Sequence, residues 1–135
     1  MTAYLSNWKK LIELSAAYGY KTICVLQPTA ALDREFAVAI TMKQYGLEQQ
    51  TGEQWQEALS VLYAEASRQI GEMRQGDTET VFLDWKDALQ PADLYFWDLV
   101  HVYDEINAQL AERMFEETQP LMEGALVGTS QKRSP

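Results

Sequence analysis

Histidine and cysteine occur once each among the 135 residues, which limits the chemistry available to the chain. The single cysteine, Cys24, excludes a framework of internal disulfide bonds. Because Cys24 lies in the apolar run TICVL, we expect a small buried hydrophobe rather than a reactive thiol. Basic residues are also few, since 11 Lys and Arg stand against 20 Asp and Glu. The net charge of −9 argues against binding to a nucleic-acid backbone, which needs a basic face.

Long apolar runs and glycine-rich loops are absent as well. No apolar stretch approaches the roughly 20 residues that cross a bilayer, so we expect no membrane span. The first ten residues, MTAYLSNWKK, contain no apolar core of a secretory signal peptide. No glycine-rich phosphate loop occurs, and we expect no bound cofactor. The composition, 47% hydrophobic and 23% charged, is that of one globular domain with a buried core.

Two short apolar runs predict the strands of a parallel sheet. Residues 21–27 and 79–84 are rich in apolar side chains without alternation, which is typical of strands buried on both faces. A helical pattern separates them, so the order of elements predicts an α/β fold with right-handed crossovers. Two strands make a poor sheet, however, and both runs are apolar enough to need neighbours on each side. The sequence therefore resembles the second half of a larger domain.

The helices are predicted from apolar residues at helical spacing. The expected ranges are 4–18, 53–73 and 104–122, with a short helix after Asp33 and a surface loop at 47–52. The long central helix is expected to bury a stripe made of Trp55, Leu59, Leu62, Ala66, Ile70 and Met73. In the last helix, the residues expected to face the core are Ile106, Leu110, Met114 and Leu121. We expect the domain to cover residues 1–123 and residues 124–135 to form a flexible tail.

The candidate catalytic residues are Asp98 and His101, which stand just ahead of the last predicted helix. A histidine that acts as a general base needs an acceptor for its second ring proton, and a carboxylate three residues away can reach it. Two other interpretations stay open. His101 could instead cap or pack against the last helix. Asp98, His101 and Asp104 could in principle ligate a divalent metal, but no fourth ligand occurs at a recognisable spacing, so no metal site is expected.

The segment YFWDLVHVYDEINAQLAERM resembles the C-terminal signature of the SGNH (GDSL-type) hydrolase superfamily. In that family an Asp-x-x-His loop precedes a short turn, commonly Gly-Asn, and then a helix. The resemblance implies that Asp98 is the catalytic acid and His101 the catalytic base, and Asn107 matches the asparagine of the turn. Ile106 departs from the pattern, because it stands where the family usually has glycine. Trp97 could line an acyl pocket or belong to the core.

Two further segments resemble the same family, and together the likeness covers most of residues 4–122. The segment YLSNWKKLIELSAAYGYKTICVLQP is similar to the helix and strand after the family's asparagine block, and TVFLDWKDAL to the strand before the histidine loop. The fold that the resemblance implies is a partial three-layer α/β/α (flavodoxin-like) arrangement with a short parallel sheet. It also implies an acyl-ester substrate, if the full domain exists.

The nucleophile of that family is missing from this sequence. Family members use a serine in a Gly-Asp-Ser motif and an asparagine in a Gly-x-Asn-Asp block, and neither motif occurs here. None of the serines follows a Gly-Asp pair; they stand at positions 6, 15, 60, 67, 130 and 134. We therefore expect a C-terminal segment of a serine ester hydrolase (esterase or lipase) that is inactive alone. The alternative is a non-catalytic α/β interaction or regulatory module, and exposed sheet edges could support self-association.

Overall fold

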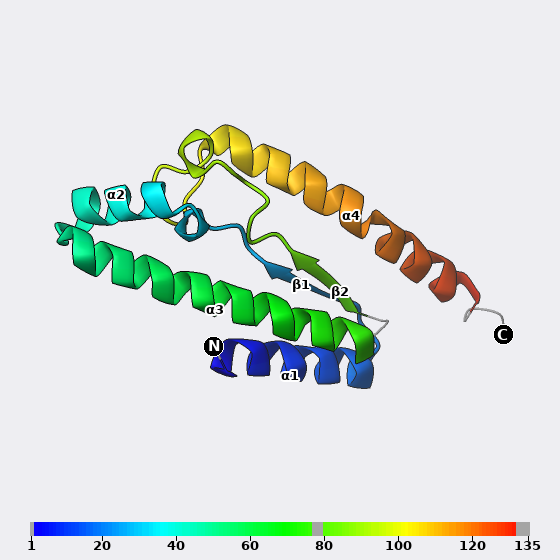
Figure 1. Cartoon of the computed structure of the whole chain (residues 1–135). Helices are drawn as coiled ribbons and strands as arrows, with labels where there is room; N and C mark the ends of the chain where they lie inside the picture. The colour runs from blue at the N-terminus through cyan, green and yellow to red at the C-terminus, as the bar shows by residue number, and fades with distance from the viewer. Residues whose placement is uncertain (1, 77–79, 132–135) are drawn as a thin grey trace.

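The computed structural model describes residues 2–76 and 80–131, with side chains described for residues 4–76 and 80–121. Two strands, four α-helices and two short 3₁₀ helices follow one another along the described chain (Figure 1). In order they are α1 (Thr2–Tyr18), β1 (Thr22–Leu26), η1 (Ala30–Leu32), α2 (Arg34–Tyr45), α3 (Gln49–Gly76), β2 (Thr80–Asp84), η2 (Ala92–Leu94) and α4 (Asp104–Gln131).

The two strands lie side by side and parallel, as predicted. The register pairs Thr22 with Thr80 at one end and Leu26 with Asp84 at the other. The chain passes between them through α2 and α3, so the coarse prediction of an α/β fold is confirmed. Residue 79, the first of the second predicted strand, lies outside the described residues.

The main core forms where one face of the sheet meets α1 and α3, which lie together along that face (Figure 1). Alternate strand residues point into it because successive side chains in a strand face opposite ways. Its buried members are Leu5, Trp8, Cys24, Leu26, Ala66, Ile70 and Phe82. Cys24 is thus the small buried hydrophobe that the sequence predicts. The first helix ends as predicted, since Gly19 has a φ of 72°, in the left-handed region that favours glycine.

The opposite face of the sheet is only partly covered, which corrects the prediction that both strands are buried on both faces. Leu83 is buried there, but Val25 and Val81 are half-buried and Ile23 is 39% exposed. The physical reason lies in the path of α4, which packs first against the loop segments after the strands. Its Ile106 joins a second cluster with Phe96 and with residues of η1 and η2.

The first half of α3 also differs from the prediction. The helix starts at Gln49, within the expected loop 47–52. The preceding helix, α2, begins after Asp33 as predicted, and the Asp33 carboxylate caps it by accepting a hydrogen bond from the Phe36 N–H at 3.1 Å. α3 extends beyond the sheet and packs there against α2, where Gly52 allows close approach because a Cβ would lie 2.7 Å from the Thr41 hydroxyl oxygen.

Two members of the predicted α3 stripe and one of the α4 stripe are exposed. Trp55 is 45% exposed and Leu62 38%, because only the part of α3 beside the sheet turns that stripe toward the core. Met114 is 37% exposed, since α4 leaves the second cluster after its first turns.

The last helix begins at Asp104, as predicted, and continues to Gln131. Residues 124–131, which we expected in a flexible tail, are therefore helical, because the backbone hydrogen-bond ladder of α4 runs on through them. Residues 132–135 lie outside the described residues. No helix in the described ranges 2–76 and 80–131 is both long and apolar enough to cross a membrane.

Candidate active site

The segment between η2 and α4 folds into a tight loop that carries Asp98 and His101. An antiparallel bridge between Phe96 and Val102 closes its base. Within it, the Trp97 N–H donates to the His101 carbonyl at 3.1 Å. Backbone hydrogen bonds therefore fix the shape of the loop that carries the two candidate residues.

The end of β1 anchors this loop from a distant part of the sequence. The buried Thr29 donates its hydroxyl proton to the carbonyl of Leu99 at 3.2 Å, and the Ala30 N–H donates to the same carbonyl at 3.2 Å. A third contact comes from α2, where the Gln44 side-chain amide donates to the Trp97 carbonyl at 3.2 Å. The loop thus sits beyond the carboxyl end of β1, the position where parallel α/β folds place their active sites.

Asp98 and His101 form the hydrogen-bonded pair that their spacing predicts. The Nδ1 atom of His101 lies 2.7 Å from Oδ2 of Asp98. The other carboxylate oxygen, Oδ1, accepts the backbone N–H groups of Val100 at 2.8 Å and His101 at 2.7 Å. Both oxygens of Asp98 are therefore engaged, and the plane of the carboxylate is fixed relative to the ring.

The charge of Asp98 is stabilised by these donors. Burial on its own raises the pKa of the Asp98 carboxyl, since it disfavours the charged form. The two backbone N–H groups and the His101 ring outweigh that effect and hold its pKa below the ordinary value of 3.8. Asp98 is consequently a carboxylate at neutral pH, and its Oδ2 accepts a hydrogen bond from the Nδ1–H group of His101.

The two side chains differ sharply in exposure. The Asp98 side chain is 10% exposed and that of His101 63%, so the ring extends from a buried carboxylate into open space. Trp97 stacks against the ring with a centroid distance of 5.1 Å and an interplanar angle of 20°. The ring does not serve as a packing residue of α4. Its Nε2 atom has no hydrogen-bond partner among the described residues.

His101 stands beside an open hollow of about 400 Å³, which we call the histidine hollow. It is lined by Gln27, Pro28, Trp97, Val100, His101, Val102, Asp104, Asn107 and Leu110. The His101 ring therefore borders a hollow that is open to a ligand. The sequence left open whether Trp97 lines a pocket or belongs to the core. Its side chain is 50% exposed and lines this hollow.

No serine lines the histidine hollow among the residues with described side chains. Ser6 and Ser15 lie in α1, and Ser60 and Ser67 lie in α3. The Ser15 hydroxyl donates to the Ile12 carbonyl at 2.8 Å, while that of Ser67 donates to the carboxylate of Asp84. The side chains of Ser130 and Ser134 lie outside the described part of the chain.

The residues after the loop clarify the departure from the family signature. Ile106 and Asn107 already belong to α4, so no separate turn stands between the histidine loop and the helix. Ile106 is buried in the second cluster, where glycine would leave a gap, while Asn107 lines the histidine hollow. Asp104 also lines it, but the described residues contain no group of three or more His, Cys, Asp or Glu arranged to hold a metal.

Sequence reasoning missed three residues that build the site. Thr29 and Gln44 hold the loop, and Gln27 lines the hollow. For Gln27 and Thr29 the available signal was their place at the end of the first predicted strand, since the carboxyl ends of parallel strands face the same site. No such signal marks Gln44, which lies in α2. Comparison of the chain with protein-family models, curated proteins and solved structures found no match in any of the three.

Proposed function

We propose that this chain supplies the acid–base half of a serine ester hydrolase of the SGNH (GDSL) type. His101 acts as the general base and Asp98 orients it, while the serine and the oxyanion donors come from residues outside this sequence. One observation carries the proposal: the His101 ring binds a buried carboxylate through Nδ1 and presents Nε2 to an open hollow. This is the arrangement that a base needs in order to take a proton from a hydroxyl.

The geometry explains how the pair would work. With Nδ1–H donated to Asp98, the lone pair of Nε2 is available to accept the hydroxyl proton of a nucleophile in the hollow. The imidazolium formed in that step is stabilised by the adjacent carboxylate, whose pKa is already held low. The stacked Trp97 limits the freedom of the ring, so less ordering is needed when a substrate binds.

The incomplete surroundings of β1 support the view that the nucleophile lies elsewhere. β1 has a strand neighbour on one side only in the described chain. α1, which packs on β1, exposes a second apolar stripe beside its buried one, made of Tyr4, Leu11, Leu14 and Tyr18. An unpaired strand edge next to an exposed apolar stripe suits additional strands and helices. These would complete the flavodoxin-like three-layer arrangement, which is part of this proposal.

The second candidate is a non-catalytic α/β interaction or regulatory module. The observation that favours it is the absence of serine from the histidine hollow among the residues with described side chains. In that case the Asp98–His101 pair would stabilise the loop, and the edge of β1 would pair with another chain.

The experiment begins with the DNA upstream of Met1. If the reading frame there encodes a Gly-Asp-Ser segment, the joined protein is expressed and assayed with a short-chain activated ester. We expect His101→Gln to lower kcat by at least about 10³-fold, because the nucleophile loses its base. Asp93→Asn, which changes an exposed side chain of η2 outside the Asp98–His101 pair, is the control and should leave kcat unchanged. An active joined protein that tolerates His101→Gln would refute the catalytic role, whereas an upstream region without coding capacity favours the module.

A further inference from the structure

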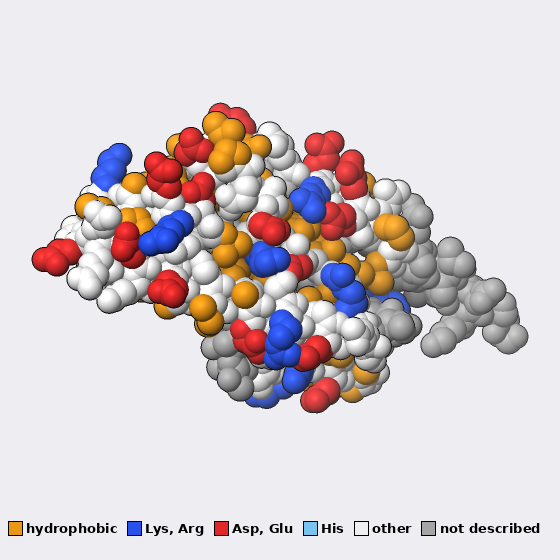
Figure 2. All heavy atoms as spheres, viewed as in Figure 1, with side chains coloured by type: hydrophobic (Ala, Val, Ile, Leu, Met, Phe, Trp, Pro, Cys, Tyr) orange, Lys and Arg blue, Asp and Glu red, His pale blue; other side chains and the backbone are white. Residues whose placement is uncertain are grey.

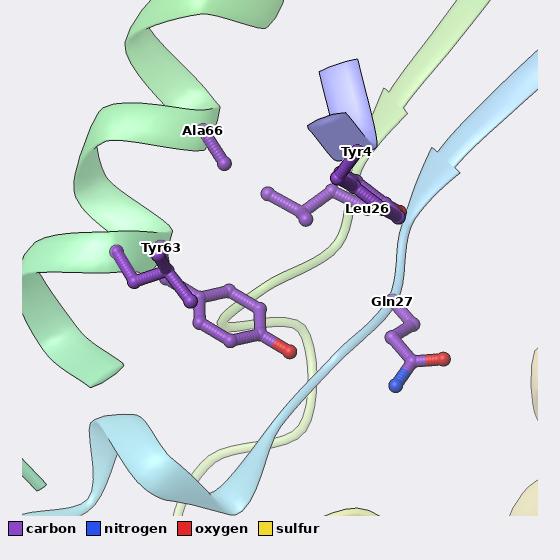
Figure 3. A pocket seen from close by; sticks show the side chains of 6 residues that line it. Tyr4, Leu26, Gln27, Tyr63 and Ala66 are labelled. Carbon is purple, nitrogen blue, oxygen red and sulfur yellow. The ribbon is translucent and has the colours of Figure 1, made fainter. Parts of the chain in front are cut away.

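A second hollow, of about 340 Å³, lies between α1, the end of β1 and α3 (Figure 3). We call it the tyrosine hollow; it is lined by Tyr4, Leu26, Gln27, Leu62, Tyr63 and Ala66. Leu26 and Ala66 are buried and form apolar walls, while Leu62 is 38% exposed. The volume is at the lower end of the roughly 300–1000 Å³ of ligand pockets, so it suits one short apolar chain.

Three polar groups border this apolar space. They are the hydroxyl of Tyr4 in α1, the hydroxyl of Tyr63 in α3 and the amide of Gln27, which directly follows β1. In Figure 3 the Tyr63 hydroxyl points toward the side on which Gln27 lies. Burial raises the pKa of the Tyr4 phenol, and the nearby Tyr63 and Cys24 raise it further, so Tyr4 stays a neutral donor. A hollow with apolar walls and neutral donors suits a neutral ligand that carries a carbonyl oxygen.

Gln27 connects this hollow to the candidate active site, because it lines both the tyrosine hollow and the histidine hollow. It is the residue that directly follows β1 and it is exposed. A ligand that reaches from His101 to Leu26 and Ala66 would have to pass Gln27, whose exposed side chain borders both hollows.

We propose that the tyrosine hollow binds the acyl chain of a neutral ester that is longer than an acetate. The identification of the ligand as an ester rests on the proposed function, whereas binding of a short apolar chain can be measured without any turnover. The lining favours one unbranched chain of about the length of a hexanoyl group, because the volume is small and half of the lining is aromatic or polar. Acetate esters would leave the apolar walls unused.

The test is binding of methyl hexanoate and methyl acetate to the whole chain, followed by NMR. We expect saturable shifts of the Tyr63 ring, the Gln27 amide and the His101 ring, with methyl hexanoate binding at least about tenfold more tightly because its additional methylenes are buried. Leu62→Trp, which enlarges a partly exposed lining residue, should weaken binding by at least about fivefold. Val61→Trp, one residue away and 65% exposed, is the matched control and should bind as the parent does.

Three results would overturn the proposal. They are equal affinity for the two esters, equal weakening by Leu62→Trp and Val61→Trp, and binding that shifts Tyr63 but neither Gln27 nor His101. The last result would mean that the hollow binds a ligand remote from the candidate site. None of them depends on catalysis, so they are distinguishable from a failure of the proposed function, which is measured by the effect of His101→Gln on the joined protein.

Discussion

The carboxylate of Asp98 bonds to the ring of His101 through one oxygen and to the backbone of the same loop through the other. Oδ2 lies 2.7 Å from Nδ1, while Oδ1 accepts the N–H groups of Val100 and His101 at 2.8 and 2.7 Å. Because each oxygen has its own partner, the tautomer of the His101 ring depends on whether the atom of residue 98 that faces Nδ1 accepts or donates a hydrogen bond.

The first prediction concerns the tautomer of neutral His101. In the parent chain, Nδ1 should carry the proton and Nε2 should not, because Asp98 is an acceptor only. In Asp98→Asn the amide oxygen must face the two backbone N–H groups, so its NH₂ group faces the ring. The proton should therefore move to Nε2. The ¹⁵N spectrum reports this directly, since His101 is the only histidine. An unchanged tautomer in Asp98→Asn would contradict the hydrogen-bond arrangement.

The second prediction concerns the dependence of stability on pH. The pKa of Asp98 is lower in the folded chain than its ordinary value of 3.8, so its carboxylate stabilises the fold above about pH 4. That contribution is lost as the pH falls through the folded-state pKa. The free energy of unfolding of the parent should therefore exceed that of Asp98→Asn by about 1–2 kcal/mol above about pH 5, and this difference should shrink as the pH falls below 4. Urea unfolding measures both. A difference that stays constant with pH would show that the charge contributes nothing.

The third prediction concerns the anchor between β1 and the loop. Thr29→Val keeps the shape but removes the hydroxyl that donates to the Leu99 carbonyl and accepts from the Ala31 N–H at 3.1 Å. Because Thr29 is 2% exposed, we expect a loss of about 1–3 kcal/mol in unfolding free energy and displaced NMR signals of the His101 ring. Thr29→Ser retains the hydroxyl and should preserve the ring signals. Undisturbed signals in Thr29→Val would mean that the loop holds its shape unaided.

The fourth prediction concerns activity. The 135-residue chain alone should show no serine-type ester turnover and no labelling by a fluorophosphonate probe. Loss of a triad nucleophile costs roughly 10⁶-fold in the best-measured serine protease, and here the family's oxyanion block is missing as well. Stoichiometric labelling of a serine, with turnover abolished by His101→Ala, would reveal a nucleophile that we did not recognise. Slow ester loss that survives His101→Ala is background.

The fifth prediction concerns the main core. Ile70→Ala should lower the free energy of unfolding by about 2–5 kcal/mol, because Ile70 of α3 is 1% exposed and belongs to the core cluster with residues of α1 and the sheet. Val61→Ala, on an exposed part of the same helix, should change it by less than about 0.5 kcal/mol. Similar losses in the two variants would mean that α3 packs differently.

The net negative charge follows from the composition, but the positions of the charged side chains on the surface do not. In Figure 2 acidic and basic side chains are interspersed over the visible face, and hydrophobic side chains show between them. The composition gave the net charge of −9, whereas the placement of ion pairs depends on the helices. Arg68, for example, binds Glu65 and Glu72, one helical turn to either side on α3.

Much of the candidate site could be predicted from the sequence because it is local. Asp98 and His101 are three residues apart, so a single turn of chain brings them together, and the helix start at Asp104 follows from the pattern after them. The anchor at Thr29 could not be predicted in the same way. It bonds to a carbonyl 70 residues away, and that distance is closed only by the crossover between the strands.

The sequence by itself determined the two strands, their parallel pairing, the helical crossover between them and the pairing of Asp98 with His101. These depend on side-chain periodicity and on short-range spacing, which are properties of the chain alone. Only the tertiary structure decided that Trp55 and Leu62 stay exposed and that Gln27 lines two hollows. The exposure of these side chains depends on which part of each helix packs against another element, because an apolar stripe is buried only where such packing occurs.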